Sequence, residues 1–384
     1  MSGKGKYLLW LLAIAIGLSS LLPRCELPQV SAEERIFLGI SLEFLGSYEL
    51  PKTTFADTPV SGISAIAYDR RLDRIYALSD DRSEGAPARF YTLRLDPEKP
   101  DVGIEKVTFL IGPDGNYYPW GAIDPEGISI TPDKTIFIST EGIAGTDIAP
   151  AVEEFDIQTG RWQRRLPIPK RYIPDGVGDK QQQGVQENSG FEALTINPTG
   201  TVPSAGEPLR LFVATESALA QDRDPDAVGM VNAKSRWLHY LVGYGRPQVL
   251  SEHFYLLDPP PPGALFHGLA EIVATSRGGH FLSLERSFGF LGFSAKIFQV
   301  ATGAASDISG VTSLKGDLTG LNPIRKQLLL DLNTLGITLD NLEGMTLGPR
   351  LPDGSKSLIL VSDDNFRDDQ VTQFLLFSLQ GLKN

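Results

Sequence analysis

The chain has 384 residues, 41% of them hydrophobic, and a formal net charge of −12 at pH 7. A chain of this length can bury a large core in one domain or in two. The acidic balance argues against nucleic acid and anionic membrane surfaces as main partners, and it suits a surface that binds cations. Composition therefore excludes a basic nucleic-acid-binding protein and leaves the fold open.

The N-terminal segment reads as a secretory signal peptide. Lys4 and Lys6 precede the apolar run Leu8–Leu22, and Val30-Ser31-Ala32 offers a small-residue cleavage site. The run is shorter than the roughly 20 residues that a spanning helix needs. We predict that residues 1–32 are removed and that the mature chain is periplasmic or extracellular, without membrane contact. An uncleaved anchor and a lipoprotein are the alternatives.

Cysteine chemistry is absent from the mature chain that this cleavage would leave. Cys25 is the single cysteine of the sequence, and it lies within the signal segment. A disulfide, a thiolate metal site and a cysteine nucleophile are therefore excluded. We expect packing and bound ions to stabilise the fold.

The mature chain alternates short segments rich in Val, Ile, Leu, Phe and Tyr with turns of Gly, Pro, Asp and Asn. This chemistry is typical of strands and turns. The expected strands include Arg74–Leu78, Phe90–Leu95, Thr135–Ser139, Leu209–Ala214, His280–Leu284, Ser357–Val361 and Gln373–Leu379. Short helices are expected only at Asp226–Tyr240 and Lys326–Leu335. The sequence predicts an all-β fold.

A repeat occurs five times along the chain: a strand-like segment opens with Gly or Glu-Gly, and the next segment ends on a carboxylate. The closing acids lie about 60 to 80 residues apart, more than the ~40–45 residues of a compact propeller blade, and long insertions account for part of the excess. The radial repeat favours a β-propeller over a sandwich. We predict one domain, residues 33–384, with five or six blades, and a surface loop at Pro259–Pro262 between two of them.

The repeat places acids at two fixed positions. The opening acids are Glu126, Glu192, Glu271 and Glu343, and the closing acids are Asp80 with Asp81, Glu141, Glu216, Glu285, and Asp363 with Asp364. Antiparallel neighbours lie about 4.8 Å apart, so both carboxylates emerge at one edge of a hairpin. Hairpins arranged radially would bring these edges together at one mouth. The alternative is that the acids are solvated turn residues.

Crowded carboxylates raise one another's pKa values or require cations. Hard oxygen ligands suit Ca²⁺ best, with Mg²⁺ or Mn²⁺ behind it. Arg82 and Arg286 each follow a closing acid and would clamp an anionic substrate such as phosphate. Salt bridges within the protein are the alternative for both arginines.

Other motifs are weak or absent. Asp222, Asp224 and Asp226 have the alternate acids of a calcium loop, but Ala233 stands where that loop requires Glu. The chain has no G-x-S-x-G elbow, which argues against a Ser-His-Asp hydrolase, and no P-loop. Trp120 would line a pocket or pack between blades.

The motifs together resemble a known family. Those that carry the resemblance are Leu78-Ser79-Asp80-Asp81-Arg82-Ser83, Pro125-Glu126-Gly127, Gly190-Phe191-Glu192-Ala193, Leu284-Glu285-Arg286-Ser287, Asn341-Leu342-Glu343-Gly344 and Val361-Ser362-Asp363-Asp364. Over nearly all of the mature chain, they are similar to the phytase-like (esterase-like activity of phytase) domain of exported bacterial proteins. The resemblance implies a propeller and an esterase or phosphoesterase activity carried by Asp and Glu residues. Ser61 departs from the pattern, because the other repeats open with an acid.

From these features we expect an exported, metal-assisted hydrolase of small anionic phosphate esters that acts as a monomer. Ca²⁺ would be held by Asp80, Asp81, Glu126, Glu141, Glu192, Glu343 and Asp363. The catalytic residues would be Glu216, Glu285, Arg82 and Arg286, with Glu216 accepting a proton from water. A non-catalytic calcium-stabilised scaffold or ligand-binding module and a lactonase-type propeller hydrolase are the rivals.

Overall fold

The computed structural model describes residues 36–96, 101–143, 146, 148–197, 206–224 and 233–382. The predicted signal segment and its cleavage site lie outside these residues. Residues 37–384 form one compact unit. No helix within the described residues is long and apolar enough to cross a membrane.

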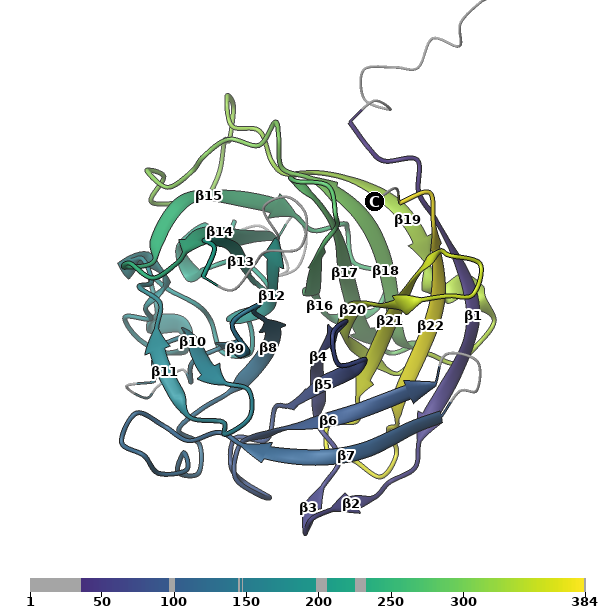
Figure 1. Cartoon of the computed structure of the whole chain (residues 1–384). Coiled ribbons are helices and arrows are strands. Elements are labelled where there is room, and N and C mark those ends of the chain that lie inside the picture. The colour runs from purple at the N-terminus through teal and green to yellow at the C-terminus, as the bar shows by residue number, and fades with distance from the viewer. Residues whose placement is uncertain are drawn as a thin grey trace, which may run out of the picture. The chain divides into compact units, whose positions relative to one another are not determined.

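Five antiparallel sheets of four strands make up this unit (Figure 1). Blade 1 contains β4 (Ile63–Asp69), β5 (Arg74–Ser79), β6 (Arg89–Asp96) and β7 (Asp101–Phe109). Blade 2 contains β8 (Pro125–Ile130), β9 (Thr135–Thr140), β10 (Ala151–Asp156) and β11 (Trp162–Arg165). Blade 3 contains β12 (Phe191–Asn197), β13 (Leu209–Thr215), β14 (Lys234–Val242) and β15 (Gln248–Leu256).

The last two blades are built the same way. Blade 4 contains β16 (Ala264–Ala274), β17 (His280–Gly289), β18 (Gly292–Ala301) and β19 (Arg325–Asp331). Blade 5 contains β20 (Asn341–Arg350), β21 (Lys356–Asp363), β22 (Thr372–Gln380) and, outermost, β1 (Ser41–Leu50). The small elements are the hairpin β2 (Thr54–Phe55) and β3 (Thr58–Pro59) and the 3-10 turns η1 (Lys170–Tyr172), η2 (Gly178–Lys180), η3 (Ala220–Asp222) and η4 (Leu332–Leu335).

The blades close into a ring. The first strands β4, β8, β12, β16 and β20 lie innermost (Figure 1), and each contacts the first strand of the next blade, with β20 returning to β4. The N-terminal β1 pairs with β22, so the last blade takes strands from both ends of the described chain. The predicted all-β propeller is confirmed, and it has five blades.

Apolar side chains fill the spaces between blades. Leu284 and Ile297 of blade 4, for example, pack in one buried cluster with Leu342 and Leu360 of blade 5. Near the axis the first strands approach very closely: a Cβ on Gly127 would lie 2.5 Å from the main-chain oxygen of Glu192. Only glycine therefore fits at this position.

The predicted strands are confirmed, and both predicted helices are wrong. Within Asp226–Tyr240 the described part from Lys234 onward is the strand β14, because it pairs on both sides with β13 and β15. Arg325–Asp331 is the outer strand β19, and only the single 3-10 turn η4 follows it. The predicted loop at Pro259–Pro262 does connect two blades, between β15 and β16.

Candidate functional site

A β-bulge interrupts every first strand at the same place. The pairing of the first and second strands skips one residue in each blade: Ser64, Glu126, Glu192, Ala270 and Glu343 in order. A bulge redirects the side chain of the extra residue. The sequence-based alignment of the repeats was therefore wrong in two blades. The residue at the bulge is Ser64 and not Ser61 in blade 1, and Ala270 and not Glu271 in blade 4.

The closing position follows from the same register. In each blade, one second-strand residue pairs with the first-strand residue that directly precedes the bulge. These second-strand residues are Ser79, Thr140, Thr215, Glu285 and Ser362. The next residue in each blade is Asp80, Glu141, Glu216, Arg286 and Asp363. Blade 4 therefore brings an arginine to the position where the other four blades bring an acid.

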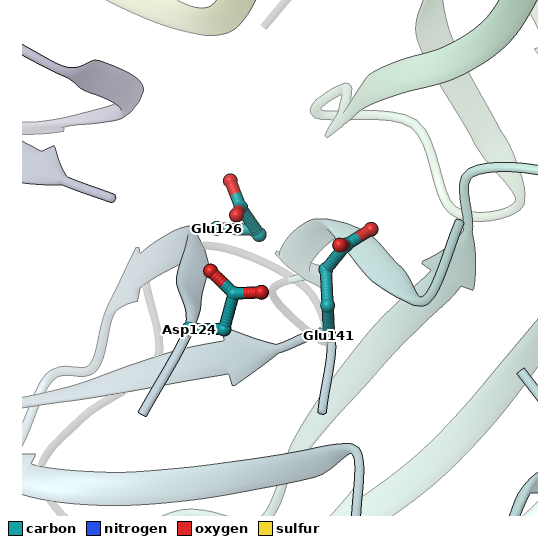
Figure 2. Close-up of side chains that lie close together, drawn as sticks. All are labelled: Asp124, Glu126 and Glu141. Atoms are coloured by element: carbon teal, nitrogen blue, oxygen red, sulfur yellow. The ribbon is translucent and has the colours of Figure 1, made fainter. Parts of the chain in front are cut away.

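The acids at the bulge and closing positions, together with Asp124, form a cluster that we call the carboxylate ring: Asp80, Asp124, Glu126, Glu141, Glu192, Glu216, Glu343 and Asp363. Three sets in it offer oxygens within 4.8 Å of one another. They are Asp124/Glu126/Glu141, Glu126/Glu192/Glu343 and Glu141/Glu192/Glu216. Figure 2 shows the first set gathered at the ends of neighbouring chain segments.

Asp124 is a ring member that the sequence analysis missed. It directly precedes β8 and is 1% exposed. The signal was the spacing Asp124-Pro125-Glu126, since alternate residues of an extended segment share a face. Its Oδ1 accepts a hydrogen bond from Arg82 Nε at 2.7 Å, whereas its Oδ2 is buried without a hydrogen-bond partner among the described residues.

Arg286 provides a cation on the blade 4 side of the ring. Its Nη2 lies 2.9 Å from Glu343 Oε1, 3.0 Å from Glu216 Oε1 and 3.8 Å from Glu192 Oε1. Its Nη1 donates to Asn341 Oδ1 at 2.8 Å. One guanidinium therefore neutralises carboxylates from blades 3 and 5.

Arg82 is placed differently from Arg286. Its side chain is 34% exposed, and besides Asp124 its Nη2 donates to Asn188 Oδ1 at 3.3 Å. Arg82 therefore meets solvent next to the set Asp124/Glu126/Glu141. Both arginines form the ion pairs that were the alternative to a substrate clamp, but only Arg82 keeps a substantial part of its side chain open.

Burial and mutual repulsion perturb the ring electrostatically. Burial raises the pKa of Glu126 well above its usual range, and the charges of Glu192 and Asp124 raise it further. Burial and the charge of Glu216 do the same to the pKa of Glu141. Eight carboxyl groups so arranged cannot all ionise without added cations.

Glu216 and Arg286 act on each other. Burial raises the pKa of Glu216 to about 7, even though Arg286 draws it downward. Burial lowers the pKa of Arg286, but the charges of Glu343 and Glu216 outweigh it and the net shift is upward. Arg286 therefore stays charged within the ring.

Two predicted site residues lie outside the carboxylate ring because other groups bind them. Asp81 Oδ2 pairs with the buried Arg89 at 2.7 Å, and its Oδ1 accepts the main-chain N–H of Glu84 at 2.6 Å. Glu285 binds Lys326 and accepts from Tyr255 Oη at 2.6 Å. Burial alone would raise the pKa of Glu285, but contacts with His267 and Lys326 outweigh it and lower the pKa.

Other candidates from the sequence are also accounted for. Glu271 Oε1 accepts the main-chain N–H groups of Leu194, at 3.1 Å, and Ile272, at 2.9 Å. Asp222 is buried in an ion pair with Arg236, its Oδ2 lying 2.6 Å from Nε, so its charge is already compensated. Trp120 does not pack in the core, because it is 73% exposed.

Comparison with known proteins identifies a family that the chain matches. The family model described as phytase-like, esterase-like activity of phytase, matches residues 58–366. No curated protein matches the sequence.

The solved structures that match this chain are distant. They include an endo-arabinase from Bacteroides thetaiotaomicron at 12% identity, with 83% of this chain and 94% of that chain covered and a TM-score of 0.44. A putative glycoside hydrolase from Parabacteroides distasonis matches at 13% identity over 88% and 93% of the two chains, with a TM-score of 0.43. The catalytic domain of the Coprinopsis cinerea GH62 α-L-arabinofuranosidase matches at 10% identity over 88% and 97%, with a TM-score of 0.42. At this distance the likenesses carry no argument about activity.

Proposed function

We propose, from the premise that this chain belongs to the phytase-like family, that it is an exported, metal-assisted hydrolase of small phosphate esters. The observation that carries the proposal is the set Asp124, Glu126 and Glu141, with ligand atoms within 4.8 Å of one another; Asp124 and Glu141 are buried and Glu126 is partly buried. Ca²⁺ is the ion proposed first, with Mg²⁺ or Mn²⁺ behind it.

The donor set fits such an ion. Two oxygens that bind one Ca²⁺ at about 2.4 Å lie no more than about 4.8 Å apart. The unpartnered Oδ2 of Asp124 and Oδ1 of Asp80 are buried acceptors that lack a donor among the described residues. Buried acceptors without donors are costly unless a ligand satisfies them. Glu126 and Glu141 belong to two sets each, so two neighbouring ions could share them.

The chain's own residues have distinct proposed roles. A bound ion would supply Lewis acidity and lower the pKa of an attacking water. Arg82, at the open side of Asp124, would bind a phosphate oxygen and neutralise charge that develops on it. Glu216 would accept the proton of the attacking water. Arg286 would hold Glu216 and Glu343 in place, and neither Asp81 nor Glu285 keeps a role, since both are paired elsewhere.

A second candidate is a non-catalytic, calcium-stabilised scaffold. The supporting observation is that blades 1, 2, 3 and 5 contribute acids to the ring, and that blade 4 contributes Arg286, which pairs with Glu216 and Glu343. An ion bound only by the folded state would stabilise the closed propeller. Turnover separates the two candidates, because both predict stabilisation by Ca²⁺.

The test is phosphate release from phytate and from an aryl phosphate by residues 33–384, titrated from chelator into millimolar Ca²⁺. Calcium-dependent release that disappears in Glu216→Gln would support the hydrolase. The matched control is Glu43→Gln, the same change on an exposed acid of β1, which should keep full activity. Folded protein that releases no phosphate at any calcium concentration would refute the proposal, and turnover of lactones instead would favour a lactonase.

A further inference from the structure

Blade 4 carries a cavity that is distinct from the carboxylate ring. It has a volume of about 520 Å³ and is lined by the Pro259–Pro262 loop and by residues of β16, β17 and β18. The outer strand β19 ends where Asp331 pairs with Lys296, so the preceding part of β18 has no β19 residue paired with it. The cavity occupies this notch.

Three polar residues that line this cavity lie next to one another. Ser287 Oγ lies 2.7 Å from His267 Nδ1, and His267 Nε2 lies 3.4 Å from Glu285 Oε2, which is an ion-pair distance without a hydrogen bond. The strand register fixes the order, because His267 stands directly opposite Ser287 across β16 and β17. Glu285 is two residues before Ser287 and therefore shares its face. All three are buried and line the cavity.

This is the arrangement of a nucleophile, a base and an orienting acid. Such a set is recognised by geometry and not by position in the sequence. The missing G-x-S-x-G elbow therefore does not exclude it, since Ser287 lies within the strand β17. Glu285 is in turn held by Lys326 and by Tyr255 Oη, which fixes its carboxylate beside His267. With its proton on Nε2, His267 presents a free lone pair at Nδ1 to the serine hydroxyl.

The walls of the cavity are largely apolar. Phe288 and Phe293, whose ring centroids are 4.8 Å apart, join the four prolines in lining it. At its edge the β17–β18 turn exposes Phe290 and Leu291 to 81% and 91%. Lys296 is the one cation among the lining residues, and it stands opposite Glu285 on β18. An apolar pocket with a few convergent polar groups is typical of sites for small ligands.

We propose that this cavity is a second, metal-independent esterase site, in which Ser287, His267 and Glu285 hydrolyse carboxylic esters with small apolar acyl groups. The acyl group would rest against the prolines, Phe288 and Phe293. The proposal is independent of the phosphate-ester activity, because none of its residues belongs to the carboxylate ring.

The reaction has two halves. Ser287 Oγ attacks the ester carbonyl carbon while its proton passes to His267 Nδ1. Lys296, which also pairs with Asp258 Oδ2 at 3.4 Å, is the lining cation that would stabilise the resulting oxyanion. The carbon–oxygen bond to the alcohol then breaks, and the alcohol leaves with the proton from His267. Water attacks the acyl-serine, gives one proton to His267 and releases the acid, and Ser287 recovers its proton. Glu285 positions His267 and stabilises it while it is protonated.

The experiment uses two probes in EDTA, which removes metal-dependent turnover. A fluorophosphonate probe with peptide mapping should mark Ser287, and hydrolysis of p-nitrophenyl butyrate should continue without metal. Ser287→Ala should abolish labelling at this site, and His267→Gln should slow hydrolysis by about 10³-fold or more. Glu285→Gln should lower kcat while leaving KM within about twofold, as expected of a positioning residue.

The matched control is Ser294→Ala, since Ser294 lies opposite Ser287 on β18 and lines the same cavity. It should keep labelling and hydrolysis. Far-UV circular dichroism and a thermal melt identify any variant that fails to fold. Labelling of Ser287 in the wild-type chain tests the proposal even if a variant does not fold. Folded wild-type protein that leaves Ser287 unmodified, or Ser287→Ala with undiminished hydrolysis in EDTA, would overturn the proposal.

Discussion

Removing the charge of Arg286 should destabilise the propeller in a way that calcium reverses. The Arg286 side chain is 15% exposed and lies 2.9 Å from Glu343 and 3.0 Å from Glu216. Breaking a buried ion pair by removing one partner costs about 3–5 kcal/mol, because it leaves a buried charge uncompensated. The change Arg286→Gln should therefore lower the free energy of unfolding by about that amount in chelator.

The expected shift in melting temperature follows from the size of the domain. With about 2.1 cal/mol/K of unfolding entropy per residue over about 350 residues, 1 kcal/mol corresponds to about 1.4 °C. Arg286→Gln should therefore melt about 4–7 °C below wild type in EDTA, measured by differential scanning calorimetry. Millimolar Ca²⁺ should raise its melting temperature by more than that of wild type, since the variant's ring has one cation fewer.

Two further variants make this result specific. Arg286→Lys keeps the charge and should lose less stability than Arg286→Gln. The double variant Arg286→Gln/Glu343→Gln should be less destabilised than the sum of the single changes, because the two side chains are paired. An Arg286→Gln protein that melts within about 1 °C of wild type in EDTA would refute the reasoning, as this is well below the shift expected for a buried ion pair.

Three other outcomes are expected. In chelator, the raised pKa of Glu216, about 7 against 4.5, favours its protonated form in the folded state. The stability that this group contributes should therefore be complete below pH 4.5 and fall by about 3 kcal/mol as the pH rises through 7. Urea unfolding at several pH values should show this fall in wild type and not in Glu216→Gln. Asp124→Asn should weaken Ca²⁺ binding at least tenfold by isothermal titration calorimetry, with Glu43→Gln unchanged, and equal affinities would remove Asp124 from the metal site. Asp81→Asn should cost about 3 kcal/mol by unpairing the buried Arg89, with the calcium affinity unaltered; a change in affinity would place Asp81 at the ion.

The sequence predicted the fold because its signals are local. Alternating apolar residues and turn chemistry predict strands, and the five repeats predict blades. The blade count needed the structure, since the outer strand of the last blade is β1, more than 300 residues from its partner β22. The helices predicted at Asp226–Tyr240 and Lys326–Leu335 failed because sheet pairing overrode local preference.

The site was predicted only in part because one-residue shifts of register are hard to see in a sequence. Side chains alternate between the faces of a strand, so a shift by one residue moves a side chain to the opposite face. In blade 4 the bulge lies at Ala270, which places Arg286 in the ring and turns Glu285 toward Ser287 and His267. The segment Glu285-Arg286-Ser287 could not show by itself which of its side chains lies on which face of the strand.

We expect this departure of blade 4 from the common pattern to decide where a cation binds. If all five blades carried an acid at the closing position, the ring would be negative throughout. Because Arg286 is there instead, Glu216 and Glu343 each pair with its guanidinium, and Glu192 lies 3.8 Å from it. The unpartnered acceptor of Asp124 lies on the blade 2 side. Of the three sets of close oxygens, the strongest uncompensated negative charge is therefore expected at Asp124, Glu126 and Glu141, where Arg82 is the only arginine paired with the set in the described residues. An ion located by anomalous scattering beside Glu343 instead would show that this charge argument is wrong.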